Sequence, residues 1–164
     1  MEIERKFLIS RPPMALESYS FHRIEQGYLC THPVVRVRRQ DDCYYLTYKG
    51  GGMMVREEYN LPLTEEAYLH LLPKSDGNVI TKTRYLIPLE NSLTCELDVF
   101  EGVFEGLILA EVEFPDEQAA GSFVPPDWFI REVTNDPRYH NSYMSSLNLE
   151  QAGNGSVSKL YGLP

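Results

Sequence analysis

The sequence predicts an all-β-dominated (α+β) protein: an eight-stranded closed antiparallel β-barrel with a few helices packed outside it. Three observations support this fold class. Eight segments rich in Tyr, Val, Ile, Phe and Thr alternate polar with apolar residues, as strands do. The linkers between them are too short for parallel crossovers, so neighbouring strands should be antiparallel. The polar side of most strands is strongly charged, which favours an enclosed lumen.

The expected strands are separated by turn residues. They cover residues 2–9, 20–29, 34–40, 43–49, 54–61, 78–88, 93–100 and 107–114. Three helices are expected as well. Thr64 is placed to cap one that reaches about residue 72, and a short one should follow Asp116. Asp136 and Pro137 are typical of a helix N-terminus and predict a helix from about residue 138 to 149.

Length and composition indicate a single domain. Residues 1–149 are expected to form it, while residues 150–164 have little apolar content and are expected to be a flexible tail. No apolar run approaches the roughly 20 residues that span a bilayer, so no membrane partner is expected. The chain opens on charged residues instead of the apolar core of a signal peptide, which favours the cytoplasm.

Charge and cysteine content exclude several classes of function. The net charge of −9 is opposite to that of a typical nucleic-acid binder. The three cysteines, Cys30, Cys43 and Cys95, are widely spaced and form no CxxC pair. They therefore indicate neither a disulfide framework nor a zinc site. The oligomeric state stays open, with a homodimer allowed.

The charged strand faces carry the functional prediction. Residues two apart share a face of a strand. The basic residues on these faces are Lys6, Arg36, Arg38, Lys49, Arg56, Lys82 and Arg84, and the acidic ones are Glu2, Glu4, Glu58, Glu96, Asp98, Glu111 and Glu113. A single strand of this kind is usually half-solvated, so an amphipathic sheet facing water is the simplest alternative. Repetition over seven strands favours a closed, charged lumen.

A charged lumen is costly unless its charges are paired or bound. The contents that fit are a polyanion held by the Arg and Lys side chains and divalent cations held by the carboxylates. Ligand sets made only of oxygen suit Mg²⁺ or Mn²⁺ better than zinc. The sequence therefore predicts a small phosphate-chain substrate together with one of these metals.

Several motifs resemble those of the CYTH domains, also called triphosphate tunnel metalloenzymes. The opening Glu2-Ile3-Glu4-Arg5-Lys6 is similar to their ExExK signature. The similarity continues through residues 26–29, 36–38, 46–50, 58–59, 82–85, 96–100 and 111–113, and residues 132–139 resemble the end of short stand-alone bacterial members. One departure is Asn60, where many relatives carry a second glutamate after the one matching Glu58.

The resemblance implies an eight-stranded tunnel and assigns roles within it. Glu2, Glu4 and Lys6 are the catalytic candidates, with Glu2 expected to orient the attacking water. The substrate-binding candidates are Lys6, Arg36, Arg38, Lys49, Arg56, Lys82 and Arg84. The metal-binding candidates are Glu2, Glu4, Glu58, Asp98, Glu111 and Glu113, with Glu96 completing the tunnel wall.

Hydrolysis of inorganic triphosphate to diphosphate and phosphate is the function that the resemblance favours, because a stand-alone domain leaves little material for a base or thiazole pocket. Two enzyme alternatives remain, a class IV-type adenylate cyclase and a thiamine or nucleoside triphosphatase. A non-catalytic polyphosphate-binding module is the alternative from a different class, and it would bind phosphate chains without releasing phosphate.

Overall fold

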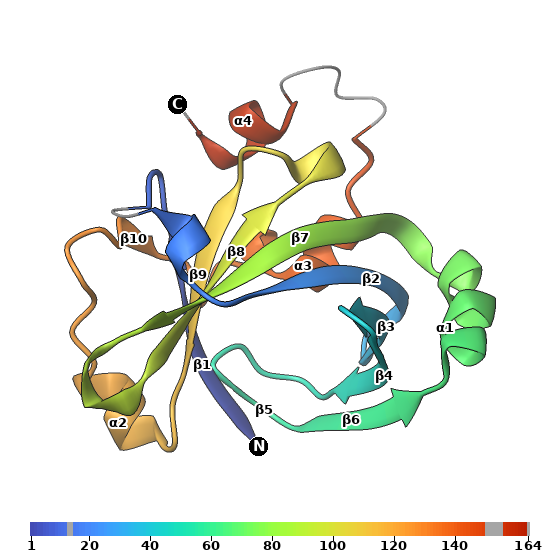
Figure 1. Cartoon of the computed structure of the whole chain (residues 1–164), viewed down its shortest axis with the longest axis horizontal. Helices are drawn as coiled ribbons and strands as arrows, with labels where there is room; N and C mark the ends of the chain where they lie inside the picture. The colour runs from blue at the N-terminus through green and yellow to red at the C-terminus, as the bar shows by residue number, and fades with distance from the viewer. Residues whose placement is uncertain (13–14, 150–155, 164) are drawn as a thin grey trace.

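The computed structural model describes residues 1–12, 15–149 and 156–163, and strands dominate it (Figure 1). The strands are β1 (Glu2–Leu8), β2 (Phe21–Thr31), β3 (Val34–Gln40), β4 (Cys43–Lys49), β5 (Val55–Arg56), β6 (Glu58–Leu63), β7 (Asp76–Pro88), β8 (Thr94–Phe100), β9 (Ile108–Glu113) and β10 (Arg131–Glu132). All pairings between them are antiparallel. The predicted fold class is confirmed.

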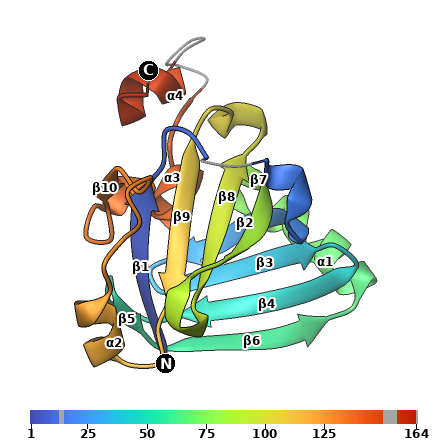
Figure 2. The ribbon, with the colours of Figure 1, turned by 60° about the vertical axis from the view of Figure 1, so that its left-hand side comes forward.

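The sheet curls into a nearly closed barrel. Its strands follow the order β1-β9-β8-β7-β2-β3-β4-β6, and β5 pairs with the start of β1 through Glu2–Arg56 and Ile3–Val55 (Figure 2). The segment predicted as one strand over 54–61 is therefore two strands. β6 pairs with β4 and β5 pairs with β1, with Glu57 between them. The break lets one segment pair with both of its neighbours, which closes the sheet.

The rest of the free edge of β1 is covered by a segment that we call the C-terminal strap, residues 131–145. Within it, β10 pairs with Phe7 and Leu8 of β1. The strap also bonds to the backbone of Lys6, which donates to Thr134 Oγ1 at 3.0 Å and accepts from the Val133 amide at 2.8 Å. The strap thus seals the seam that the short β5 leaves open.

Two of the three predicted helices begin where expected. Thr64 caps α1 (Glu65–Leu71) and Asp116 caps α2 (Glu117–Ser122), each by accepting a backbone amide three residues ahead. The remaining short helical segments are α3 (Asn141–Ser145), α4 (Ser156–Tyr161) and the 3₁₀ turns η1 (Leu16–Ser18), η2 (Leu72–Lys74), η3 (Glu90–Ser92), η4 (Gly102–Phe104) and η5 (Pro137–Tyr139). No helix in the described ranges is long and apolar enough to cross a membrane.

The third predicted helix, over 138–149, is wrong as a continuous element. Asp136 does cap its start, but only the 3₁₀ turn η5 forms there, and α3 begins after His140. His140 has an extended backbone (φ −84°, ψ 132°), and its ring Nε2 lies 2.9 Å from the Thr134 carbonyl oxygen. This tertiary contact holds the break between the two segments.

The C-terminal residues differ from the expected flexible tail. Residues 150–155 lie outside the described part of the chain, but residues 156–161 form α4. Val157 and Tyr161 are buried, and the Tyr161 hydroxyl donates to the Arg138 carbonyl at 2.9 Å. The helix α4 therefore packs against the C-terminal strap.

Two apolar clusters hold the fold together. One lies outside the barrel under α2 and contains Phe7, Leu97, Val112 and Phe129. The other contains residues that share a strand face with the charged ones: Leu8, Val34, Ile80, Phe100 and Leu109. They pack against Tyr139, Met144, Val157 and Tyr161 of the C-terminal segments. The predicted lumen is therefore not charged along its whole length, because this cluster fills one end of it.

Candidate active site

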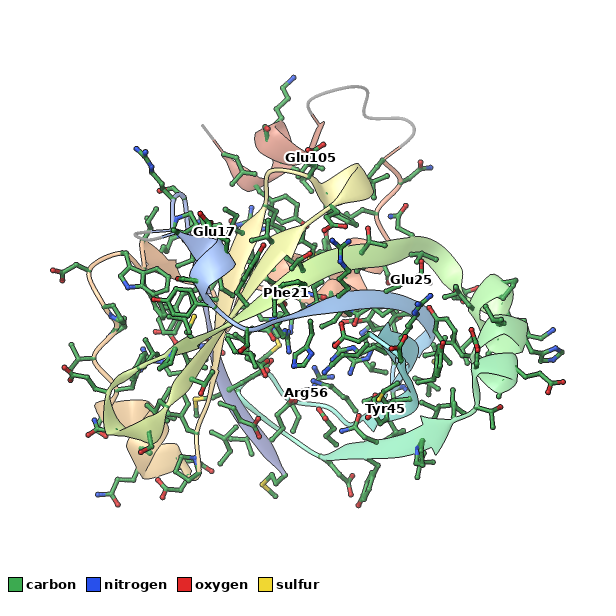
Figure 3. The ribbon with its side chains drawn as sticks, viewed as in Figure 1. Glu17, Phe21, Glu25, Tyr45, Arg56 and Glu105 are labelled. Atoms are coloured by element: carbon green, nitrogen blue, oxygen red, sulfur yellow. The ribbon has the colours of Figure 1, made fainter. Side chains whose placement is uncertain are left out.

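The barrel encloses a charged cavity of about 210 Å³. Figure 3 shows side-chain nitrogens gathered inside the ring of strands, with Arg56 among them. The lining residues are Glu2, Glu4, Lys6, Tyr28, Val34, Arg36, Arg38, Gln40, Lys49, Arg56, Glu58, Lys82, Arg84, Glu96, Glu111, Glu113, His140, Asn141 and Ser142. Every charged residue that the sequence placed in the lumen is present except Asp98.

The lining of the lumen changes from acidic to basic to apolar along its axis. The pairing of β1 with β9 illustrates this change. Glu4 lies opposite Glu113, Lys6 opposite Glu111, and Leu8 opposite Leu109. Carboxylates thus occupy the end where β1 begins, basic residues and their partners the middle, and the apolar cluster the far end. A bound polyanion would therefore lie in the middle, with cations at the acidic end.

Arg84 and Lys82 are already paired with carboxylates. Arg84 donates to both oxygens of Asp98 at 2.7 Å and to Glu111 at 2.7 Å, and it also pairs with Glu96. Lys82 pairs with Asp98, which is fully buried behind the two cations. The pairing holds the pKa of Asp98 below its usual range despite its burial. Asp98 is thus placed to position Arg84 and Lys82, which differs from the metal-ligand role implied by resemblance.

Two arginines of β3 have no carboxylate partner among the described residues. Arg36 is 6% exposed, and its Nε atom is buried without any hydrogen-bond acceptor. Arg38 donates to the neutral Gln26 side chain at 2.9 Å. Burial and the neighbouring Arg36 lower the pKa of Arg38 to about 9. An anion would stabilise cations of this kind, which fits the role in substrate binding predicted for Arg36 and Arg38.

The acidic end has an excess of carboxylates. Lys49 Nζ binds both oxygens of Glu2 at 2.9 and 2.8 Å and one oxygen of Glu58 at 2.9 Å. Within the described residues, Glu4 and Glu113 have no ion-pair or side-chain hydrogen-bond partner, although they lie side by side on β1 and β9. Burial, followed by repulsion from Glu4, raises the pKa of Glu2 to about 7. Desolvation and neighbouring carboxylates raise the pKa of Glu113 as well.

These carboxylates fit a divalent cation that is shared with a substrate. Among the described side chains, no three carboxylate, imidazole or thiol groups already form a metal site. Mg²⁺ does not require one, because it commonly binds through one or two carboxylates and the phosphate oxygens of its substrate. Among the described residues that line the cavity, Glu4 and Glu113 are the two carboxylates without a partner. A cation between them would offset the burial and the neighbouring carboxylates that raise the pKa of Glu113.

Several lining residues were not predicted because they are neutral. Tyr28 comes from β2, and His140, Asn141 and Ser142 come from the strap. The only sequence signal for any of them was the family motif over 26–29. The departure at Asn60 also finds a role, because its amide donates to Glu58 at 2.6 Å and its oxygen accepts from Thr47 at 2.7 Å.

A barrel with carboxylates at one end and unpaired arginines in the middle defines a protein that binds a short polyanion together with cations. The chain belongs to the CYTH domain family, whose model matches residues 1–139. It is 40% identical over 149 residues to an inorganic triphosphatase of Nitrosomonas europaea, and the match covers 88% of this chain and 96% of the relative. It is 43% identical over 149 residues to an inorganic triphosphatase of Acetivibrio thermocellus, covering 86% and 90%.

Solved structures agree with the sequence comparison. The crystal structure of an inorganic triphosphatase superposes with a TM-score of 0.68 at 37% identity, covering 90% of this chain and 95% of that one. The family relationship implies a dependence on divalent metal. It is consistent with the unpaired carboxylates at the acidic end of the lumen.

Proposed function

We propose that this chain is an inorganic triphosphatase, which hydrolyses tripolyphosphate to diphosphate and phosphate with Mg²⁺ or Mn²⁺. The observation that carries the proposal is the lumen itself, in which unpaired arginines and unpaired carboxylates line the same cavity. The names of the two curated relatives and of the solved structure support the same activity. The apolar far end suits a short phosphate chain, because it offers no cationic path through the barrel.

The chain's own residues supply binding and orientation, which is most of what phosphoryl transfer needs. Arg36 and Arg38 would bind the phosphate chain, while Lys6 and Arg84 are held in place by Glu111. Glu4 and Glu113 would hold the metal, which supplies charge neutralisation and an activated water. Glu2 would orient that water, since its raised pKa suits exchange of a proton near neutral pH.

One feature favours a second candidate, the hydrolysis of organic triphosphates. A neighbouring pocket of about 510 Å³ shares Val34, Arg56, His140 and Ser142 with the lumen. Its other walls include Pro33, Met53, Pro137 and Tyr143, which could contact an organic group. Among the described residues that line the charged cavity, Val34 and Tyr28 offer little apolar surface, so a base or thiazole would have to occupy this outer pocket.

A substrate panel tests the proposed function. We expect kcat/KM for tripolyphosphate to exceed that for ATP and thiamine triphosphate by roughly tenfold or more. Tripolyphosphate has no organic group, whereas the other two substrates must place a base or a thiazole outside the charged cavity. Phosphate release and cyclic AMP would be measured in Mg²⁺ and in Mn²⁺. A preference for an organic triphosphate would favour the second candidate, and cyclic AMP as the main product of ATP would identify a cyclase.

A further inference from the structure

Asn141, the first residue of α3, joins two cations of the lumen through hydrogen bonds. Its Oδ1 atom accepts from Lys82 Nζ at 3.0 Å and from Gln26 Nε2 at 2.9 Å. Gln26 Oε1 in turn accepts from Arg38 Nε at 2.9 Å. Asn141 is 8% exposed and Gln26 is fully buried, so these two amides are shielded from water.

The chemistry of the donors fixes the direction of these bonds. Lys and Arg side chains can only donate, so each must face an amide oxygen. The Gln26 side-chain oxygen accepts from Arg38, so the NH₂ group of Gln26 points to Asn141. The Asn141 side-chain oxygen accepts from this NH₂ group and from Lys82 Nζ. Neutral amides at these positions orient Arg38 and Lys82 without adding to the negative charge of Asp98, which already pairs with Lys82. A carboxylate would add a second negative charge, and an apolar side chain would remove an acceptor from buried donors.

The end of α3 has contacts with β7 that do not involve Asn141. Asn78 of β7 donates to the carbonyl oxygens of Met144, Ser145 and Leu147 at 3.3, 3.3 and 2.7 Å. Gly77 packs so closely that a Cβ atom there would lie 2.0 Å from the Ser145 oxygen. The end of α3 is therefore fixed from outside the lumen. Asn141 also lies beyond residue 139, where the match to the family model ends.

We propose that Asn141 is a positioning residue for substrate binding, which holds Lys82 and, through Gln26, Arg38 in the orientation that meets the phosphate chain. The inference rests on the proposed function, because the phosphate chain is the ligand that these cations would share. It assigns a functional role to a neutral residue of the C-terminal strap, outside the charged strand faces.

The test compares Asn141→Ala with Asn78→Ala as the matched control. Each substitution removes an asparagine that lies in α3 or bonds to it. Asn141 lines the cavity, whereas Asn78 does not. We expect Asn141→Ala to raise KM for tripolyphosphate roughly tenfold while kcat changes less than about twofold, since a bond to a charged donor is lost from the binding site. Asn78→Ala should lower the melting temperature and leave KM within about twofold of the parent.

The outcomes separate positioning from support of the fold. An unchanged KM in Asn141→Ala, a fall in kcat alone, or an equal rise of KM in both variants would each overturn the proposal. If Asn141→Ala does not fold, Asn141→Asp replaces it. The aspartate keeps both acceptor contacts but adds a second negative charge beside Lys82, which already pairs with Asp98. KM should therefore rise at least as much, and an unchanged KM would again overturn the proposal.

A binding measurement keeps this result distinct from the proposed function. Calorimetric titration with tripolyphosphate in excess chelator reports affinity without turnover. If the parent releases no phosphate with any metal, the proposed function fails, yet weaker tripolyphosphate binding by Asn141→Ala than by Asn78→Ala still supports positioning. Equal affinities in the two variants contradict it, whatever the parent's activity.

Discussion

Glu4→Gln and Glu113→Gln should each lower the turnover number by roughly a hundredfold at a fixed, limiting metal concentration, because a metal's charge stabilisation is worth several kcal/mol in the transition state. Each substitution is nearly isosteric and removes one negative charge from the pair that faces across β1 and β9. The apparent affinity for Mg²⁺ should fall, and raised metal concentration should restore part of the activity. Metal titrations of kcat provide the measurement.

Glu17→Gln is the matched control for this prediction. Glu17 lies in η1 on the outer surface and is exposed. Its substitution by Gln removes the same charge far from the lumen. Its metal titration should overlay that of the parent. If Glu4→Gln and Glu113→Gln also show the parent's apparent metal affinity, these carboxylates are not the ligands and the assignment of the acidic end is wrong.

Arg84→Ala should lower the free energy of unfolding by about 3–5 kcal/mol, the usual cost of removing one partner from a buried ion pair. Arg84 contacts Asp98, Glu96 and Glu111, and Asp98 is fully buried. Without the guanidinium, Asp98 retains only Lys82 and Glu111 only Lys6 among their cationic partners in the described residues. Denaturant unfolding monitored without substrate measures the loss.

Arg38→Ala makes the informative contrast, because Arg38 has no carboxylate to leave behind. Its removal also relieves repulsion from Arg36 and Arg84, which contributes to the lowered pKa of Arg38. We expect the free energy of unfolding to change by less than about 1 kcal/mol, while KM for tripolyphosphate rises roughly ten- to a hundredfold. Equal stability losses in the two variants would contradict the division of the basic residues into paired and unpaired sets.

Much of the barrel follows from the alternation of residues along the strands, because a period of two specifies which side chains share a face. It does not specify which neighbour a strand pairs with along its length, so the break at Glu57 between β6 and β5 was not predictable. Nor does it say where the lumen ends. Leu8 and Ile80 have the same facing as Lys6 and Lys82, but only the packing of the C-terminal segments makes them a closed end.

The charged part of the candidate site was predictable for the same reason, since charges stand out on an alternating face. Their partners were not, and Asp98 illustrates this. Its facing is that of a lumen residue, but its oxygens are occupied by Arg84 and Lys82. Asn141 was missed because it is neutral and because its position depends on the break at His140, where the ring contacts the Thr134 carbonyl oxygen.

Phosphorus NMR of tripolyphosphate turnover tests the central claim most directly. With Mg²⁺ or Mn²⁺, the spectrum should show diphosphate and phosphate appearing in equal amounts. Excess chelator should stop the reaction, because the carboxylates would then lack the metal that activates the attacking water. Tripolyphosphate that binds but stays intact in both metals would identify a binding module. Undiminished hydrolysis in excess chelator would contradict the role of the carboxylates.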